Sequence, residues 1–207
     1  KLLESKGILV FQTSGVPLHI MRGACVAKEI LPVIIINSND TQNGRIFSLF
    51  HELVHIVLRE DGISNFRYSD RNLYDPIEVH CNQTAAEVLV PTTTLLESLV
   101  VCSHNMGNAL WEAEELQKLS NRFCVSREVI LRRLLTLGRT TNNFYRDYRD
   151  NQDFGTKKKS TGGDYYRNKI AKNGGLYLNL VLQGYYQEKL TASTFWDCTQ
   201  IKVSNLA

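Results

Sequence analysis

The sequence predicts an α+β protein with a small N-terminal β-sheet, a helical core and a helical C-terminal extension. Two observations carry this prediction. The first 40 residues contain short β-branched or apolar runs separated by turn-forming residues, and the rest of the chain has apolar residues at helical spacing. Hydrophobic residues make up 43% of the 207 residues and charged residues 22%, which is typical of a globular protein with a core of its own.

Three strands are expected in the N-terminal part, at Gly7–Phe11, Leu18–Met21 and Val33–Asn37. The helix after them begins at Asn39-Asp40-Thr41, where short polar side chains make good N-caps, and it fades near Asp61-Gly62. Further helices are predicted from Pro76 to about Val90, Thr92 to Val100, Trp111 to Phe123, Ser126 to Leu137 and Leu176 to Lys189, with a short one from Thr191.

The predicted domains follow from these patterns. Residues 1–105 form a catalytic core, 106–140 a helix–turn–helix-like helical brace, and 141–207 a basic loop with the C-terminal helical extension. The chain becomes polar from Arg139 to Gly163, and this stretch is expected to be an exposed loop. The chain opens without an initiator Met, so we expect it to be part of a longer protein.

Composition limits the compartment and the partners. The five cysteines show no CxxC pairing, which favours free thiols in a reducing cytoplasm. No apolar stretch is long enough to span a membrane. The net charge is +3, but residues 121–172 hold 13 basic against 5 acidic side chains. This basic stretch can make a weak DNA contact, bind an acidic protein, or be a solvated surface.

The most informative motif is His51-Glu52-Leu53-Val54-His55, an HExxH inside a largely apolar run. A helix places residues four apart on one face, so His51 and His55 can direct two imidazoles at one metal ion. Glu52 projects beside that face as a candidate general base. A zinc hydrolase needs these groups and a coordination position left open for water. The alternative is a buried helix that carries two histidines by chance.

A catalytic zinc needs a third protein ligand, and the helix from Pro76 offers candidates. Glu78 and Asn82 lie four apart on one face, so Glu78 can coordinate the metal while Asn82 hydrogen-bonds a ligating histidine. Glu87 is the alternative ligand, although it lies on the opposite side of this helix. His80 points away from Glu78 at the helical period.

The HExxH segment, followed by Glu78-x-x-x-Asn82-x-x-Ala85-Ala86 and Pro91, resembles the ImmA/IrrE family of metallopeptidases. The resemblance covers residues 1 to 140. It implies a zincin-like core with a gluzincin-like site in which His51, His55 and Glu78 bind zinc and Glu52 is the general base. It also implies a missing N-terminal helix–turn–helix region, and cleavage of helix–turn–helix repressors that control stress-response or mobile-element genes.

The remaining predictions concern the oxyanion donors, the metal ion and the alternative function. Tyr68, Tyr74 and His80 are the candidate donors to the oxyanion. Zn²⁺ is the expected metal, and Mn²⁺ or Fe²⁺ would accept the same ligands. The alternative function is a DNA-binding or zinc-sensing regulator with a structural metal site. Its candidate phosphate contacts are Arg122, Arg127, Arg132, Arg133 and Arg139.

Overall fold

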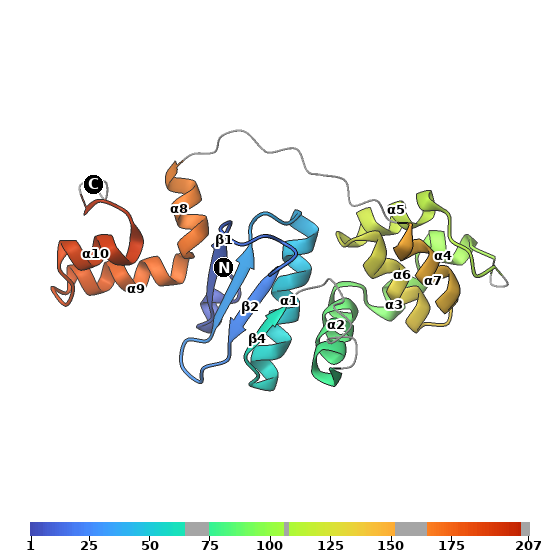
Figure 1. Ribbon diagram of the computed structural model, residues 1–207, viewed down its shortest axis with the longest axis horizontal. Helices are drawn as coiled ribbons and strands as arrows, with labels where there is room; N and C mark the ends of the chain where they lie inside the picture. Colours follow the sequence, from blue (N-terminus) through green and yellow to red (C-terminus); the bar gives the residue numbers. More distant parts are fainter. Residues whose placement is uncertain (65–74, 106–107, 152–164, 204–207) are drawn as a thin grey trace. The chain divides into compact units, whose positions relative to one another are not determined.

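The computed structural model describes residues 1–64, 75–105, 108–151 and 165–203, and confirms the α+β class (Figure 1). The chain forms two compact units. The first contains Lys1–Asp40, His55–Arg67 and Lys159–Ala207, and the second contains Thr41–Val54 and Tyr68–Lys158. The domain limits expected at residues 105 and 140 stay a prediction. Within the described ranges, no helix is both long and apolar enough to cross a membrane.

The first unit contains a four-stranded mixed sheet in the order β1-β3-β2-β4. Its strands are β1 (Leu9–Thr13), β2 (Gly23–Val26), β3 (Val33–Asn37) and β4 (Gly62–Ser64). β3 runs parallel to β1 and antiparallel to β2, and β4 is antiparallel to β2. Ile34 and Ile36 of β3 are buried, as the run of β-branched residues predicts for a central strand.

The strand predicted at Leu18–Met21 is wrong, because these residues form a turn. The carbonyl of Pro17 accepts hydrogen bonds from the backbone N–H groups of Ile20 and Met21. The buried Asn37 side chain donates to the carbonyls of Val16 and Met21, at 2.7 and 2.8 Å, and holds this loop against the end of β3. The apolar run is therefore used in a turn, and the pairing strand β2 begins only at Gly23.

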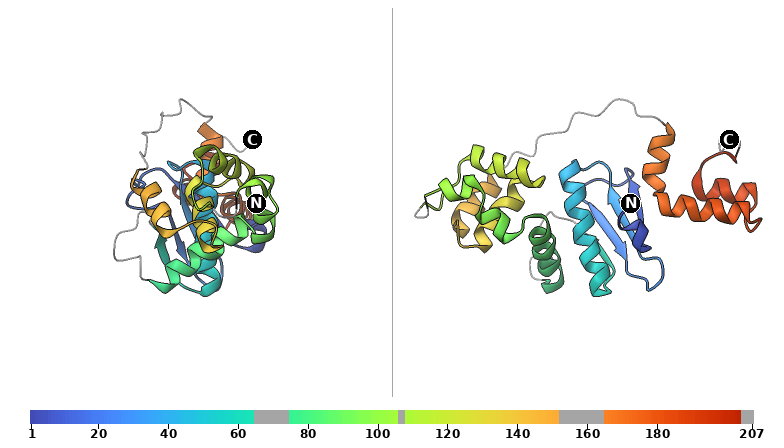
Figure 2. Two further views of the ribbon diagram at one scale, coloured as in Figure 1. Left: turned by 90° about the vertical axis from the view of Figure 1, so that its right-hand side faces the viewer. Right: turned by 180° about the vertical axis from the view of Figure 1, so that it is seen from behind.

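The C-terminal helices belong to the same unit as the sheet. They are α8 (Tyr165–Asn173), α9 (Gly175–Tyr186) and α10 (Ala192–Thr199), and the sequence predicted the last two but not α8. α8 lies beside the edge strand β1, and α9 packs against α10 (Figures 1 and 2). Tyr177 meets the ring of Phe11 edge-on at 5.2 Å between centroids, and Glu4 accepts a hydrogen bond from the N–H of Leu176. These contacts cover the exposed edge of the sheet, which otherwise presents unpaired backbone groups.

The second unit is helical. It contains most of α1 (Gln42–Leu58), followed by α2 (Pro76–Leu89), α3 (Thr92–Leu96), α4 (Leu99–Ser103), α5 (Ala113–Phe123), α6 (Arg127–Thr136) and α7 (Asn142–Asp150). The expected pairing of α5 with α6 is confirmed, and their buried face includes Leu119 and Ile130. The loop predicted from Arg139 is wrong in part, because Thr141 caps α7 and its tyrosines pack against this core.

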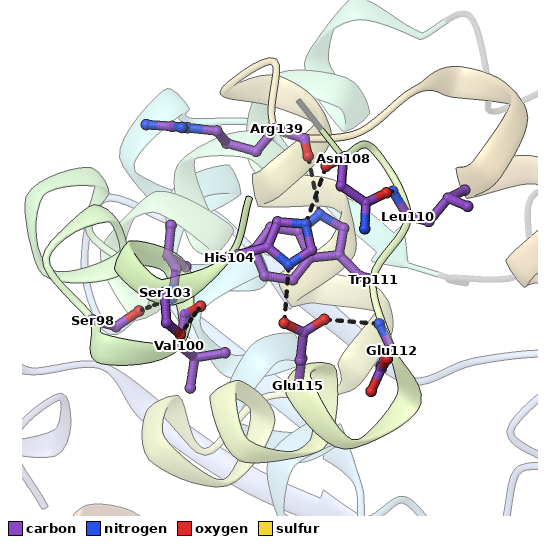
Figure 3. A network of polar contacts seen from close by, with 11 residues as sticks. Ser98, Val100, Ser103, His104, Asn108, Leu110, Trp111, Glu112, Glu115 and Arg139 are labelled. Carbon is purple, nitrogen blue, oxygen red and sulfur yellow. Dashed lines mark hydrogen bonds and ion pairs between the residues drawn. The ribbon is translucent and has the colours of Figure 1, made fainter. Parts of the chain in front are cut away.

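A network of polar contacts surrounds His104, Trp111 and Glu115, between α4 and the start of α5 (Figure 3). The ring of His104 stacks on Trp111 at 3.8 Å between centroids, and its Nδ1 lies 2.9 Å from a carboxylate oxygen of Glu115. The other oxygen of Glu115 accepts the backbone N–H of Glu112, and Trp111 donates its indole N–H to the carbonyl of Arg139. The network therefore ties the start of α5 to the end of α6 through side chains that are themselves hydrogen-bonded.

We expect Gly174→Ala to lower the free energy of unfolding of the first unit by about 1–3 kcal/mol or more. Gly174 has φ 75° and ψ 151°, a conformation nearly restricted to glycine, and a Cβ there would overlap the backbone oxygen of Val10 in β1. Urea unfolding of both proteins measures the difference. Gly7→Ala is the matched control, since Gly7 also has a positive φ of 83° but faces open space. Equal losses in the two variants would contradict the close approach of α9 to β1.

Candidate metal centre

Helix α1 carries the HExxH motif. The hydroxyl of Thr41 accepts the N–H of Gly44 at 3.0 Å, which confirms the predicted capping by this polar cluster. The helix ends at Leu58, where Arg59 takes a left-handed φ of 61° and the N–H of Glu60 bonds the carbonyl of His55. The motif therefore lies in the second half of a regular helix, and helical geometry places His51 and His55 on the same face.

The buried face of α1 is unusually polar. Phe47, Ser48, His51, Glu52 and His55 are almost fully buried, with exposed fractions of 8% or less. Their spacing of three, four and eight residues gathers them on one side of the helix. Two imidazoles and a carboxylate buried together need binding partners, because the free-energy cost of leaving them unsatisfied is large.

Helix α2 supplies the third group. Its N-cap Asp75 accepts the N–H of Ile77, and Pro76 occupies the first turn, where its missing N–H costs nothing. Glu78 projects from this first turn, with one carboxylate oxygen 3.2 Å from Nε2 of His51. Both residues belong to the second unit, so the contact lies within a single compact part of the chain.

His51, His55 and Glu78 form one group in which the three ligand atoms all lie within 4.8 Å of one another. Two imidazole nitrogens and one carboxylate oxygen make a donor set of catalytic zinc, which leaves a position open. Asn82, one turn after Glu78, has a buried side-chain oxygen with no hydrogen-bond partner among the described residues. A ring N–H of a ligating histidine is the kind of donor this oxygen lacks. The residues present fit a metal ion.

The comparison with family models agrees with this geometry. The model of the peptidase family described as the IrrE N-terminal-like domain matches residues 3–135. The chain belongs to this family. Searches among curated proteins and among solved structures found no match. Membership in the IrrE N-terminal-like family supports a peptidase, and the matched region contains both α1 and α2.

The remaining predicted site residues are the three candidate oxyanion donors, His80, Tyr68 and Tyr74. His80 is exposed on α2, with a ring nitrogen 3.5 Å from the hydroxyl of Thr84, and it does not belong to the His51–His55–Glu78 group. Tyr68 and Tyr74 lie outside the described residues. The roles of these three side chains as oxyanion donors stay a prediction.

Cys81 is a neighbour of the site that the sequence analysis did not assign. Its side chain is fully buried on α2. Burial raises the pKa of its thiol to about 12, and the nearby carboxylates of Glu78, Glu52 and Asp75 act in the same direction. The thiol therefore stays protonated at neutral pH and adds no charge beside the two site carboxylates. Its spacing of three residues from Glu78 was the signal that could have identified it.

Glu87, the alternative ligand, has another role. Its carboxylate pairs with Arg133 of α6 and accepts hydrogen bonds from the N–H and hydroxyl of Thr92. Arg133 is almost fully buried, and it also donates to the carbonyl of Val90 and the hydroxyl of Thr92. This clamp of Glu87, Thr92 and Arg133 fastens the C-terminal end of the helix that carries Glu78 to the helical core.

The same contacts bear on the predicted DNA surface. Arg133 is engaged with Glu87, and Arg132 donates two hydrogen bonds to the hydroxyl of Tyr145. Arg132 and Arg133 thus have internal partners, which favours a bracing role for α6 over a phosphate-binding one. The weak DNA contact through residues 121–172 stays a prediction.

We expect Glu87→Gln to destabilise the second unit by about 1 kcal/mol at neutral pH, with a smaller loss in acid. Burial acts to raise the pKa of the Glu87 carboxyl, but hydrogen bonds from Thr92 and the charge of Arg133 outweigh it and hold the pKa below 4.5. A carboxyl with a lowered pKa stabilises the fold above its unfolded pKa, and this contribution is lost as pH falls through the folded pKa.

Urea unfolding at neutral pH and at about pH 3 measures this difference. Glu97→Gln, which removes the same charge from an exposed position nearby, is the control and should leave the free energy of unfolding at neutral pH unchanged. A Glu87→Gln loss that stayed constant down to acid pH would contradict the charged clamp.

Proposed function

We propose that this protein is a zinc-dependent endopeptidase that cleaves a protein substrate at a specific site. The observation that carries the proposal is the gathering of His51, His55 and Glu78 within 4.8 Å, on two helices inside the region matched by a peptidase family. The buried Glu52 directly follows the first of these residues, where a general base is needed.

The residues have separate roles in this proposal. A bound zinc ion supplies Lewis acidity, which polarises the scissile carbonyl and makes a water molecule more acidic. Glu52 accepts the proton of the attacking water on its carboxylate and later passes it to the leaving amine. His51, His55 and Glu78 hold the metal, and Asn82 orients a ligating imidazole by accepting its second ring N–H. Mn²⁺ or Fe²⁺ would be accepted by the same ligands.

The proposed substrate is a helix–turn–helix transcriptional repressor, whose cleavage relieves repression of stress-response or mobile-element genes. The support is the likeness of the motifs around His51 and Glu78 to the ImmA/IrrE metallopeptidases. A DNA-binding or zinc-sensing regulator with a structural metal is the weaker candidate, because such a site has no use for a buried Glu52 beside the ligands.

The purified protein should bind one zinc ion, and His55→Ala and Glu78→Ala should each bind it about 100-fold more weakly or lose it. Removing either donor leaves two ligands, too few for a stable catalytic site. Elemental analysis together with a chelator competition measures stoichiometry and affinity. His80→Ala is the matched control, since it removes an exposed imidazole from the same helix as Glu78. Retention of zinc by Glu78→Ala would move the third ligand elsewhere.

Glu52→Gln should keep zinc but lower the rate of cleavage by about 10²–10⁴-fold, since Gln cannot accept the proton. The assay incubates wild type with a set of purified helix–turn–helix repressors and detects new peptide ends by mass spectrometry. Glu60→Gln removes a carboxylate just beyond the same helix and serves as the control. Cleavage by Glu52→Gln at the wild-type rate would remove Glu52 from the mechanism, and cleavage that survives removal of zinc would exclude the metallopeptidase.

A further inference from the structure

We propose that Gly62 is a positioning residue for the metal ligand His55, because its missing side chain makes the space in which the imidazole sits. The inference rests on the proposed metal centre. It concerns the first strand residue after α1, which lies outside the HExxH motif and outside α2. Figure 1 shows that β4 follows α1 directly along the chain.

The backbone brings Gly62 back to His55 through a tight reversal. The left-handed Arg59 ends the helix, and Glu60 then donates its N–H to the carbonyl of His55 at 3.0 Å. Only one more residue, Asp61, separates this bond from Gly62. The connection between His55 and the start of β4 is therefore too short to let Gly62 lie far from the imidazole.

The start of β4 is held in place by β2 and the segment after it. Gly62 pairs with Cys25 in the antiparallel ladder. The thiol of Cys25 lies 3.6 Å from the carbonyl oxygen of Glu60, and the carboxylate of Asp61 accepts the N–H of Ala27 at 2.7 Å. These contacts on both sides of the reversal prevent Gly62 from moving away from the ring.

A Cβ at Gly62 would lie 3.3 Å from Cγ and Nδ1 of His55, and 3.4 Å from Cδ2. Ordinary contacts between carbon atoms are about 3.5–4.0 Å, so the ring would have to give by a few tenths of an ångström. His55 is only 2% exposed and has little room to do so. Ligand distances in metal sites normally lie within about 0.2 Å of their ideal values, so a ring shift of this size would disturb coordination by His55.

The backbone conformation does not demand glycine at this position. Gly62 is not among the glycines with positive φ. Inside a strand, glycine is unfavourable by roughly 0.5–1 kcal/mol relative to alanine because it loses more conformational entropy on folding. A residue chosen only for the strand would therefore not be glycine, and contact with the imidazole is the constraint that explains it.

The experiment compares wild type, Gly62→Ala and Gly15→Ala by zinc affinity, from chelator competition, and by the visible absorption of the Co²⁺-loaded protein. We expect the zinc affinity of Gly62→Ala to fall by about 10-fold or more, and its Co²⁺ spectrum to change, because the ligand geometry changes. Gly15→Ala should match wild type in both, since a Cβ at Gly15 meets only the Thr13 hydroxyl at 3.8 Å. A change in fold stability alone would not move the Co²⁺ spectrum.

A double-mutant cycle keeps the test decisive if Gly62→Ala folds poorly. The loss of stability caused by Gly62→Ala should disappear in a His55→Ala background, since the contact needs both side chains. An unchanged loss there, or a zinc affinity and Co²⁺ spectrum equal to those of wild type, would overturn the role of Gly62. Failure of wild type itself to bind zinc would instead overturn the proposed metal centre.

Discussion

The constraint on which the structure depends is the placement of two imidazoles and a carboxylate on the buried face of one helix. His51, Glu52 and His55 are at most 2% exposed. Burial of such groups is favourable only when they are hydrogen-bonded or bound, and a metal ion is one partner that suits His51 and His55 together with Glu78. The third candidate ligand, Glu78, comes from α2.

Positioning Glu78 is a matter of fixing both ends of α2. At its start, Asp75 caps the first turn from which Glu78 projects. At its end, Arg133 is bound to Glu87, Val90 and Thr92, so α6 holds the helix against the core. In the proposed function, a ligand on such a capped and clamped helix would lose little further freedom on metal binding, and this preorganisation would strengthen binding. The family match ends at residue 135, just after this clamp.

Much of this could be predicted from local patterns. The strand at Val33, the helices from Gln42 and Pro76, and the pairing of α5 with α6 each follow from residue spacing and caps that act over a few residues. Predictions failed where distant parts of the chain decide the outcome. The run at Leu18–Met21 looks like a strand, yet Asn37 holds it as a turn. Glu87 looked like a spare ligand until its pairing with Arg133, 46 residues away, was seen.

The sequence by itself determined which chemical groups share a helix face, because an HExxH on a helix and a carboxylate one turn from an asparagine are set by helical periodicity. The tertiary structure decided what those groups meet. It brought Glu78 to 3.2 Å from His51, engaged Glu87 with Arg133, placed a buried neutral thiol beside the carboxylates, and laid Gly62 against the ring of His55. These contacts join residues that local spacing cannot relate, because their distances depend on how separate elements pack.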